Sequence, residues 1–397
     1  MKGCIFKRRL PSGKITWGYS LDHGKGADGR RKQQFKSGFS LKGEAEEALR
    51  KLLNEKDTGE LVRPDPTMFA VFIEDWFREH AARQCTLKTV ERYRQLADYI
   101  KPHIGAVKLQ DLTALMLERI FNHLKDAGGR DRKTKKARPL SAKTVHHIAG
   151  VVNVALSTAL RWKLIKSNPM DAVVLPKVTK KEALALDPSQ VAWYLDAARA
   201  CGLYAFLMID SATGCRRGEL LALTWADVSF PLRVLTISKS LEQTKAGLRV
   251  KATKNEKPRP ISIPQSAIEI LKMIRSGQEH NRRMFGPDYR SDLDLVFCSP
   301  DGSYLKPDSI SSKCSLIAKK AGLKSVSLHT LRHSHTSLLL SLGVPLPTVS
   351  KRLGHSSPHF TATVYSHALP RDEEAAAEIW ESAFQKTMAT DQKAKVS

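Results

Sequence analysis

The chain has 397 residues, 42% of them hydrophobic, which leaves room for two or three globular domains. Its 65 Lys and Arg against 40 Asp and Glu give a net charge of +25 and a pI near 9.8, which favours an anionic partner, nucleic acid above all. No apolar run approaches 18 residues, and the basic N-terminus leads into Pro11, Ser12 and Gly13, so neither a transmembrane helix nor a secretory signal is expected. The six scattered cysteines form no CxxC pair, which indicates a reducing cytoplasm and no disulfide framework.

The first 60 residues are typical of a small basic unit of three strands followed by a helix. Alternating apolar residues and turn residues place these elements at 4–6, 16–21, 33–39 and 44–54, with a Gly-rich loop at 22–29. Residues 1–42 carry 11 Lys or Arg and only two Asp. A β-ribbon of this charge can enter a DNA major groove, and a solvated basic face is the alternative. The candidate DNA contacts are Arg8, Arg9, Lys14, Arg31 and Lys32.

A linker at 61–66 leads into a helical segment, 67–175, in which four apolar stripes predict a compact bundle. Thr86, Thr113 and Ser141 are the expected N-caps of its second, third and fourth helices. Between the last two helices, residues 128–138 hold six positive charges and one negative charge. This segment is typical of a phosphate-contacting loop, although a solvated loop without a partner is the alternative. The candidate contacts in it are Arg132, Lys133, Lys135 and Lys136.

The remainder, after a basic linker at 176–187, is a larger mixed region with a short antiparallel sheet. Strands are expected at 234–238 and 259–263, and helices at 188–199, 216–223, 266–278, 310–321, 331–341, 348–353 and 371–387.

Four short segments of this region carry the residues with chemistry. They centre on Arg216 at the start of a helix, Lys254 on a polar turn, the run from His329 to His335, and His355 followed by Tyr365. Each is ambiguous alone, since an exposed Arg, a hairpin Lys and a packed Tyr are all common. A zinc site at the two histidines four residues apart is disfavoured, because no carboxylate lies in that segment and its arginine would repel a dication.

Taken together and in this order, the residues Arg, Lys, His-x-x-Arg, Leu-Gly-His and Tyr resemble the signature of the tyrosine recombinases. The chain is similar to the phage and conjugative-element integrases of that family over nearly its whole length. The resemblance implies a multidomain α+β fold: an arm-type DNA-binding domain of three strands and a helix at 1–60, a helical core-binding (SAM-like) domain at 67–175, a mainly α catalytic domain with a small antiparallel sheet at 183–385, and a tail at 386–397.

The resemblance also implies a catalytic set, which consists of Arg216, Lys254, His329, Arg332, His355 and Tyr365. Tyr365 would attack a backbone phosphate and form a 3′-phosphotyrosine, while the two arginines hold the non-bridging oxygens. In the family, the lysine protonates the leaving 5′-hydroxyl, the first histidine is a candidate proton acceptor and the second a donor to the phosphate. No metal, cofactor or ATP is expected.

Three further residues have open assignments. Glu219 orients Arg216 or lies on the helix surface, Arg217 is expected to contact DNA or solvent, and His333 to pack or support the site.

The implied function is site-specific recombination that integrates a mobile element and is expected to excise it. The implied partners are double-stranded DNA at core and arm attachment sites and further copies of the chain in a tetramer on DNA. An excision factor or a host DNA-bending protein is a further candidate, and the expected location is the bacterial cytoplasm. A type IB topoisomerase or telomere resolvase, a DNA-binding regulator with an inactive catalytic fold and a zinc hydrolase are the alternatives.

Overall fold

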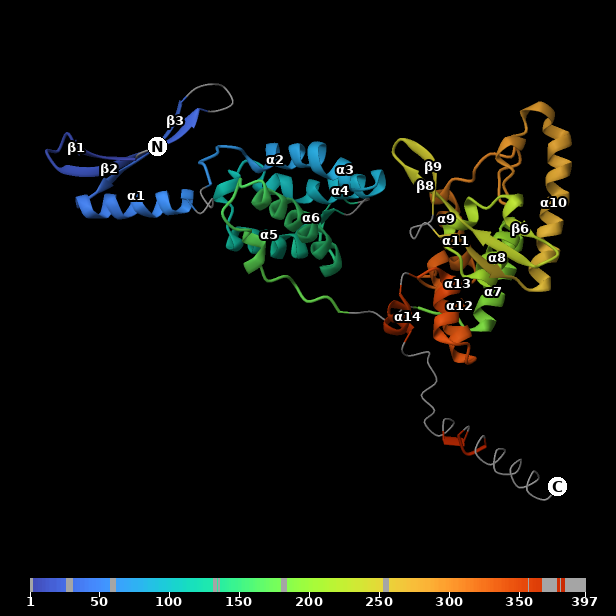
Figure 1. Cartoon of the computed structure of the whole chain (residues 1–397). Coiled ribbons are helices and arrows are strands. Elements are labelled where there is room, and N and C mark those ends of the chain that lie inside the picture. Colours follow the sequence, from blue (N-terminus) through green and yellow to red (C-terminus); the bar gives the residue numbers. More distant parts are fainter. Residues whose placement is uncertain are drawn as a thin grey trace, which may run out of the picture. The chain divides into compact units, whose positions relative to one another are not determined.

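The computed structural model describes residues 3–25, 31–57, 62–130, 134, 136–179, 184–252, 257–355, 357–365, 377–378 and 380–382. The chain divides into two compact units, Met1–Lys180 and Lys181–Ser397, and each is described by itself. Both contain helices and antiparallel strands, in agreement with the expected multidomain α+β fold (Figure 1). Within the described ranges, no helix combines the length and the apolar character needed to cross a bilayer.

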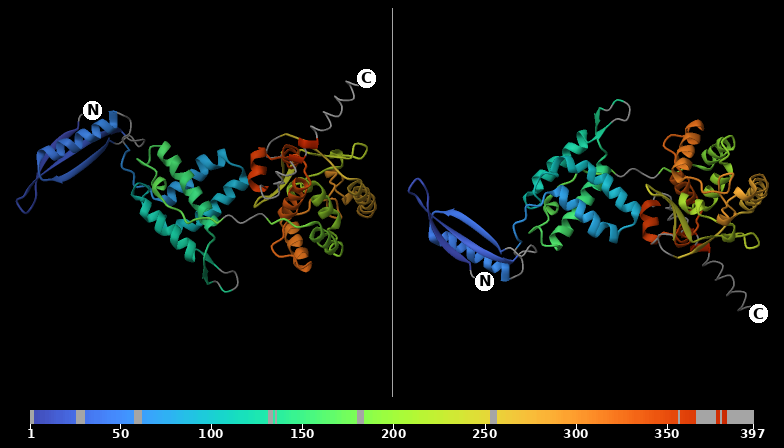
Figure 2. Two further views of the ribbon diagram at one scale, coloured as in Figure 1. Left: turned by 90° about the horizontal axis from the view of Figure 1, so that it is seen from below. Right: turned by 90° about the horizontal axis from the view of Figure 1, so that it is seen from above.

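The first unit opens with a three-stranded antiparallel sheet in the order β1-β2-β3. The sheet and its helix comprise β1 (Cys4–Arg9), β2 (Ile15–Lys25), β3 (Arg31–Phe39) and α1 (Lys42–Asp57). Figure 2 shows α1 lying along one face of the strands (blue). Because side chains alternate along a strand, Tyr19 and Leu21 of β2 point to the same face and are buried there with Leu49 of α1. The expected elements are confirmed, but β2 continues to Lys25 where a loop had been expected from residue 22.

Helices form the rest of the first unit: α2 (Phe69–Trp76), which continues through a π-helical turn (Phe77–Ala81) into α3 (Ala82–Gln84), then α4 (Leu87–Ile104), α5 (Ala114–Ala127) and α6 (Ala142–Arg161), with 3-10 turns at Leu109–Asp111 and Pro169–Ala172. The three predicted N-caps, Thr86, Thr113 and Ser141, are confirmed. Each side chain accepts a hydrogen bond from the backbone N–H three residues later. The apolar stripes meet in one core, in which Trp76 stacks on Tyr93 with ring centroids 6.0 Å apart.

The basic segment at 128–138 begins and ends in a small antiparallel ribbon instead of a plain loop. Its strands are β4 (Gly129–Arg130) and β5 (Ala137–Arg138).

The second unit contains α7 (Pro188–Arg199), α8 (Tyr204–Thr213), α9 (Arg217–Leu221), α10 (Gln265–Phe285), α11 (Pro307–Lys320), α12 (Leu328–Ser341), α13 (Leu346–Leu353) and α14 (Pro358–Tyr365). Short 3-10 turns lie at Trp225–Asp227, Gly286–Asp288 and Ser291–Leu293. One sheet has the order β10-β7-β6, formed by β6 (Val228–Ser229), β7 (Val234–Ile237) and β10 (Arg259–Ser262), while β8 (Lys239–Thr244) and β9 (Gly247–Ala252) form a hairpin.

Most predicted elements of this unit are confirmed, and α7 has the predicted bounds. The elements that were not predicted include the central helix α8, which packs on α7, α10 and α12, the short strand β6 and the β8–β9 hairpin. The helix predicted at 371–387 falls mainly outside the described residues, as does the tail at 386–397.

Candidate active site

The site is built around the turn that ends α13. Gly354 caps this helix in the left-handed conformation, with φ of 66°, where a side chain is strained. A helix end leaves backbone carbonyls without intrahelical partners, and its partial negative charge attracts cations. Three arginines from separate elements donate to three consecutive carbonyls here: Arg259 Nε to Arg352 O at 3.0 Å, Arg332 Nη2 to Leu353 O at 2.8 Å, and Arg216 Nη2 to Gly354 O at 3.4 Å.

Arg216 is the N-cap of α9, not a residue of its first turn as the sequence had suggested. Its backbone is extended, and Glu219 accepts hydrogen bonds from both its backbone N–H (2.9 Å) and its Nη1 (3.0 Å). The Glu219 carboxylate therefore holds both the backbone and the side chain of Arg216 in place. The Arg216 side chain keeps 40% of its surface exposed, which leaves it open to a bound anion.

Glu219 itself is buried, with 2% of its side chain exposed. Burial raises the pKa of this carboxyl, but the hydrogen bond and charge of Arg259, together with Arg216, hold the pKa below its usual value. Glu219 is thus an ionised carboxylate between two arginines, and its open assignment resolves toward orientation of Arg216. Arg259 was not among the predicted site residues, because a strand arginine carries no local signal.

Arg332 lies on α12 and is almost wholly buried. Its Nη1 donates to Gly214 O at 2.6 Å, at the end of α8, in addition to the bond to Leu353 O. It therefore links the turn before Arg216 to the turn before His355. Burial, then the charge of Arg216, lowers the pKa of Arg332 to about 10, so the guanidinium stays charged at neutral pH.

The two predicted histidines lie beside these arginines. His329 lies in the first turn of α12 and is exposed. Partial desolvation of its ring, together with the charges of Arg332 and Arg216, lowers its pKa. His355 follows the α13 cap, and its Nδ1 lies 2.7 Å from Thr361 Oγ1 of α14. Burial and then the charge of Arg332 lower the pKa of His355 to about 4. His355 is therefore neutral at pH 7, and the shift at His329 favours the neutral form of its ring.

Tyr365 ends α14 and is 2% exposed, packed against Leu340, Val349 and Leu353. Its hydroxyl lies 2.5 Å from Nδ1 of His333. Burial raises the pKa of Tyr365, and hydrogen bonding with Thr336 and the charge of Arg332 oppose that rise. No local feature of the sequence indicates this contact, apart from the position of His333 one turn after His329.

The structure thus brings together Arg216, Arg332, His329, His355 and Tyr365. Lys254 lies outside the described residues, between the end of β9 and the start of β10.

The predicted DNA contacts are spread over both units. Arg8 and Arg9 are exposed on β1, Lys14 is exposed just before β2, and Lys136 is exposed beside β5. Arg31 and Lys32 belong to β3. Arg132, Lys133 and Lys135 lie outside the described residues.

Arg217 points to the start of α11. Its Nη1 donates to Pro307 O at 2.8 Å and to Ser311 Oγ at 2.5 Å, and lies 3.5 Å from Asp308. About a third of the side chain stays exposed, so Arg217 joins α9 to α11 as well as facing solvent.

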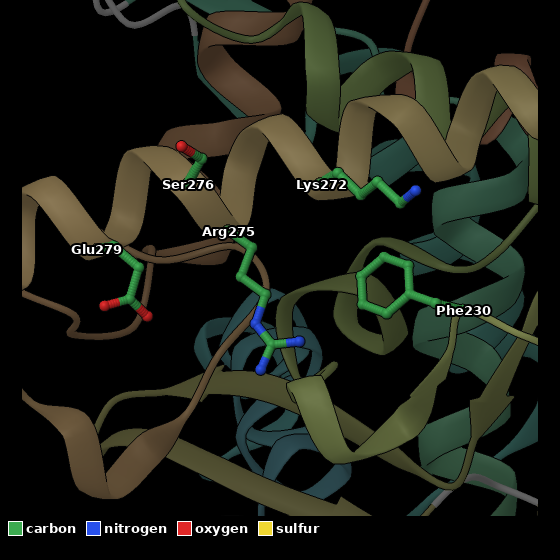
Figure 3. Close-up of a pocket in the computed structure, with 5 residues that line it drawn as sticks. All are labelled: Phe230, Lys272, Arg275, Ser276 and Glu279. Carbon is green, nitrogen blue, oxygen red and sulfur yellow. The ribbon is translucent and has the colours of Figure 1, made fainter.

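A separate surface pocket of about 390 Å³ lies on α10. Figure 3 shows Lys272, Arg275, Ser276 and Glu279 projecting from this helix, with Phe230, from the loop between β6 and β7, beside Lys272 and Arg275. The Arg275 guanidinium lies over the Trp225 ring, 5.6 Å from its centroid. None of the predicted catalytic residues lines this pocket. Among the described side chains, no three His, Cys, Asp or Glu residues gather as metal ligands would.

Comparisons with known proteins find integrase domains in three successive segments of the chain. Family models match residues 185–371 (phage integrase family), 71–177 (phage integrase SAM-like domain) and 7–56 (arm DNA-binding domain). A tyrosine recombinase XerC-like protein of Caldanaerobacter subterraneus is 25% identical over 72% of this chain and 75% of its own length. The ICEBs1 integrase of Bacillus subtilis is 26% identical over 79% of this chain and 81% of its own length.

Solved structures share the fold. The Tn1549 transposon integrase in complex with transposon right end DNA superposes with a TM-score of 0.65 at 19% identity, over 80% of this chain and all of that one. A lambda integrase tetramer bound to a Holliday junction gives 0.55 at 15% identity, over 89% of this chain and 96% of that one.

Proposed function

This chain belongs to the tyrosine recombinase, or phage integrase, family of enzymes that cleave and rejoin DNA strands, and we propose that it integrates and excises a mobile element by means of Tyr365. The observation that carries the proposal is the contact of the buried Tyr365 hydroxyl with α12, the helix that presents His329 and Arg332.

The phosphodiester must first lose its electrostatic protection. As phosphorus becomes five-coordinate, charge builds on its two non-bridging oxygens, and fixed cations stabilise that charge better than water does. Arg216 and Arg332 are held in place by Glu219 and by backbone carbonyls, so their positions are set before DNA arrives. Loss of one such group costs several kcal/mol of barrier, on the order of 100-fold or more in rate.

Covalent catalysis then divides one difficult exchange into two steps. The Tyr365 oxygen attacks phosphorus, a 3′-phosphotyrosine forms, and the 5′-oxygen leaves with a proton from Lys254. A different 5′-hydroxyl can then attack the phosphotyrosine and rejoin the strand without ATP, because the phosphotyrosine conserves the ester bond. His355, neutral and oriented by Thr361, is suited to hydrogen bonding with the phosphate.

Two basic regions are proposed to hold the DNA. The β1–β3 sheet, with exposed Arg8 and Arg9, would contact arm sites, while the 128–138 segment contacts phosphates near the core site. Exchange between two duplexes needs four strand cleavages, which matches four copies of the chain on DNA, as in the lambda integrase tetramer described above. A DNA-bending protein or an excision factor would set the direction of the reaction.

A nicked suicide duplex from the end of the element that carries this gene tests the proposal. The native chain should become covalently attached to it, because the short strand beyond the nick diffuses away and blocks rejoining. The Tyr365→Phe variant should bind the duplex equally well and give no adduct. An adduct of equal yield from that variant would refute Tyr365 as the nucleophile.

A further inference from the structure

The nucleophile makes its closest polar contact with a histidine outside the signature. Tyr365 Oη lies 2.5 Å from His333 Nδ1, and the two ring centroids are 5.4 Å apart. His333 is one helical turn after His329 on α12, so the two rings share a face of the helix and meet edge to face at 4.6 Å.

The proton of the Tyr365 hydroxyl must leave before or during the attack on phosphorus. The side chain is 2% exposed, so a protein group beside the hydroxyl is better placed than bulk water to accept the proton. Among the side chains that the structure describes, those beside the hydroxyl are His333, Thr336 and the charged Arg332. A threonine hydroxyl and a guanidinium are not bases at neutral pH, which leaves the imidazole.

His329 is placed for a different task. It is exposed at the start of α12 beside Arg216 and Arg332, where a phosphate would sit, whereas His333 lies deeper and contacts α14. The edge-to-face packing of the two rings fixes the orientation of both. One histidine therefore faces the phosphate and the next faces the nucleophile.

We propose that His333 is a catalytic residue, the proton acceptor for Tyr365 in strand cleavage. The Tyr365 O–H proton moves to His333 Nδ1 as the phenolic oxygen forms its bond to phosphorus. The bond from phosphorus to the 5′-oxygen breaks, and that oxygen takes a proton from the acid proposed above. In rejoining, a 5′-hydroxyl gives its proton back to that same group and its oxygen bonds to phosphorus. The bond from phosphorus to the Tyr365 oxygen breaks, and this oxygen recovers its proton from His333. This assignment rests on the proposed function of Tyr365.

His333→Asn tests the assignment, since asparagine can hydrogen-bond to the tyrosine but cannot take its proton. The measurement is the single-turnover rate of covalent complex formation by the full chain on the nicked suicide duplex, from pH 5.5 to pH 9. We expect the variant to be slower than the native chain on the order of 100-fold at pH 7. The rate difference between the variant and the native chain should shrink as pH rises, because a growing fraction of the Tyr365 phenol is then already ionised and needs no proton acceptor. His359→Asn, in an exposed position on α14, is the matched control and should cleave at the native rate.

A second variant separates proton transfer from packing. A fluorinated tyrosine at position 365 ionises more readily, so it should recover much of the rate lost in His333→Asn while changing the native rate little. A loss that is equal at every pH and not recovered by the fluorinated residue would mean that His333 only packs. A native or increased rate in His333→Asn would also overturn the proposal, since His333 would then be dispensable or would restrain Tyr365.

Failure of this inference differs from failure of the proposed function. If Tyr365→Phe abolishes the adduct while His333→Asn behaves as the native chain does, the nucleophile stands and the acceptor is wrong. If Tyr365→Phe still forms the adduct, both assignments fall.

Discussion

Arg259 donates from both terminal nitrogens to the two carboxylate oxygens of Glu219, at 3.2 and 2.5 Å. The pair is buried, and the same carboxylate holds Arg216. We therefore expect Arg259, a strand arginine outside the signature, to act as a positioning residue for Arg216, the proposed phosphate ligand.

Replacing Arg259 tests this relation. Arg259→Met leaves the buried Glu219 with half of its partners, which should destabilise the second unit by about 3 kcal/mol. The remaining Arg216 would turn toward the carboxylate, so covalent complex formation should slow at least tenfold while DNA affinity stays within about twofold. Arg259→Lys should restore part of the rate. Thermal melting and single-turnover cleavage measure the two effects, and a native cleavage rate in Arg259→Met would contradict the role.

The cap of α13 gives a prediction about backbone conformation. Gly354 has φ of 66°, and a Cβ there would lie 2.9 Å from Arg259 Nη1. Gly354→Ala should therefore cost about 1–3 kcal/mol of stability and displace the guanidinium. Gly277, inside α10 with open space around it, is the control, and Gly277→Ala should be neutral or stabilising by up to about 1 kcal/mol. Denaturant unfolding of both variants decides, and equal stabilities would contradict the cap role.

His335 makes the stability of the second unit depend on pH. Its Nδ1 lies 2.9 Å from Ser211 O, and its Nε2 accepts from Arg352 Nε at 3.1 Å, so the ring is bound in its neutral form. Burial, then the charge of Arg352, lowers its pKa to about 4.

The direction in which stability changes with pH follows from proton linkage. The unfolded chain takes up the proton near pH 6.5 and the folded chain only near pH 4, so stability is full above about 6.5 and falls as pH drops toward 4. We expect a loss on the order of 1–3 kcal/mol across this window, with a smaller slope in His335→Asn than in the native chain. Unfolding midpoints at pH 7 and pH 5 measure it, and equal slopes would exclude His335 as the source.

The basic sheet gives a prediction about salt. Arg8→Ala with Arg9→Ala should weaken binding to an arm-site duplex and reduce the slope of log affinity against log salt by about 1–2, because each lost phosphate contact removes about 0.9. Cleavage of the core site should stay unchanged. Lys42→Ala is the control, since this exposed lysine pairs with Glu46 at 3.2 Å. An unchanged slope in the arginine variant would remove these residues from the DNA interface.

The sequence predicted those elements whose bounds are set by neighbouring residues in the chain. Helix α7 has its predicted bounds because Asp187 and Gln190 form a capping box and a proline opens the helix, all visible in the sequence. Helix α8 escaped prediction because its residues are apolar on nearly every side, as suits a helix buried among α7, α10 and α12.

The candidate site likewise has features that the sequence predicted and features that it did not. The signature residues could be found by their order, but the supporting contacts could not, because each joins residues far apart in the chain. His333 meets Tyr365 only when α14 packs on α13, which itself packs on α12, and Arg259 meets Glu219 only when β10 lies beside α9. Such pairs depend on tertiary packing, which no local periodicity records.

Identification of the residue that carries DNA after cleavage is the most direct test of Tyr365 as the nucleophile. The native chain would be trapped on the nicked suicide duplex, digested with nuclease and protease, and the nucleotide-bearing peptide sequenced by mass spectrometry. We expect a 3′-phosphodiester on Tyr365. A nucleotide on any other residue, or a trapped complex without a covalent bond, would contradict it.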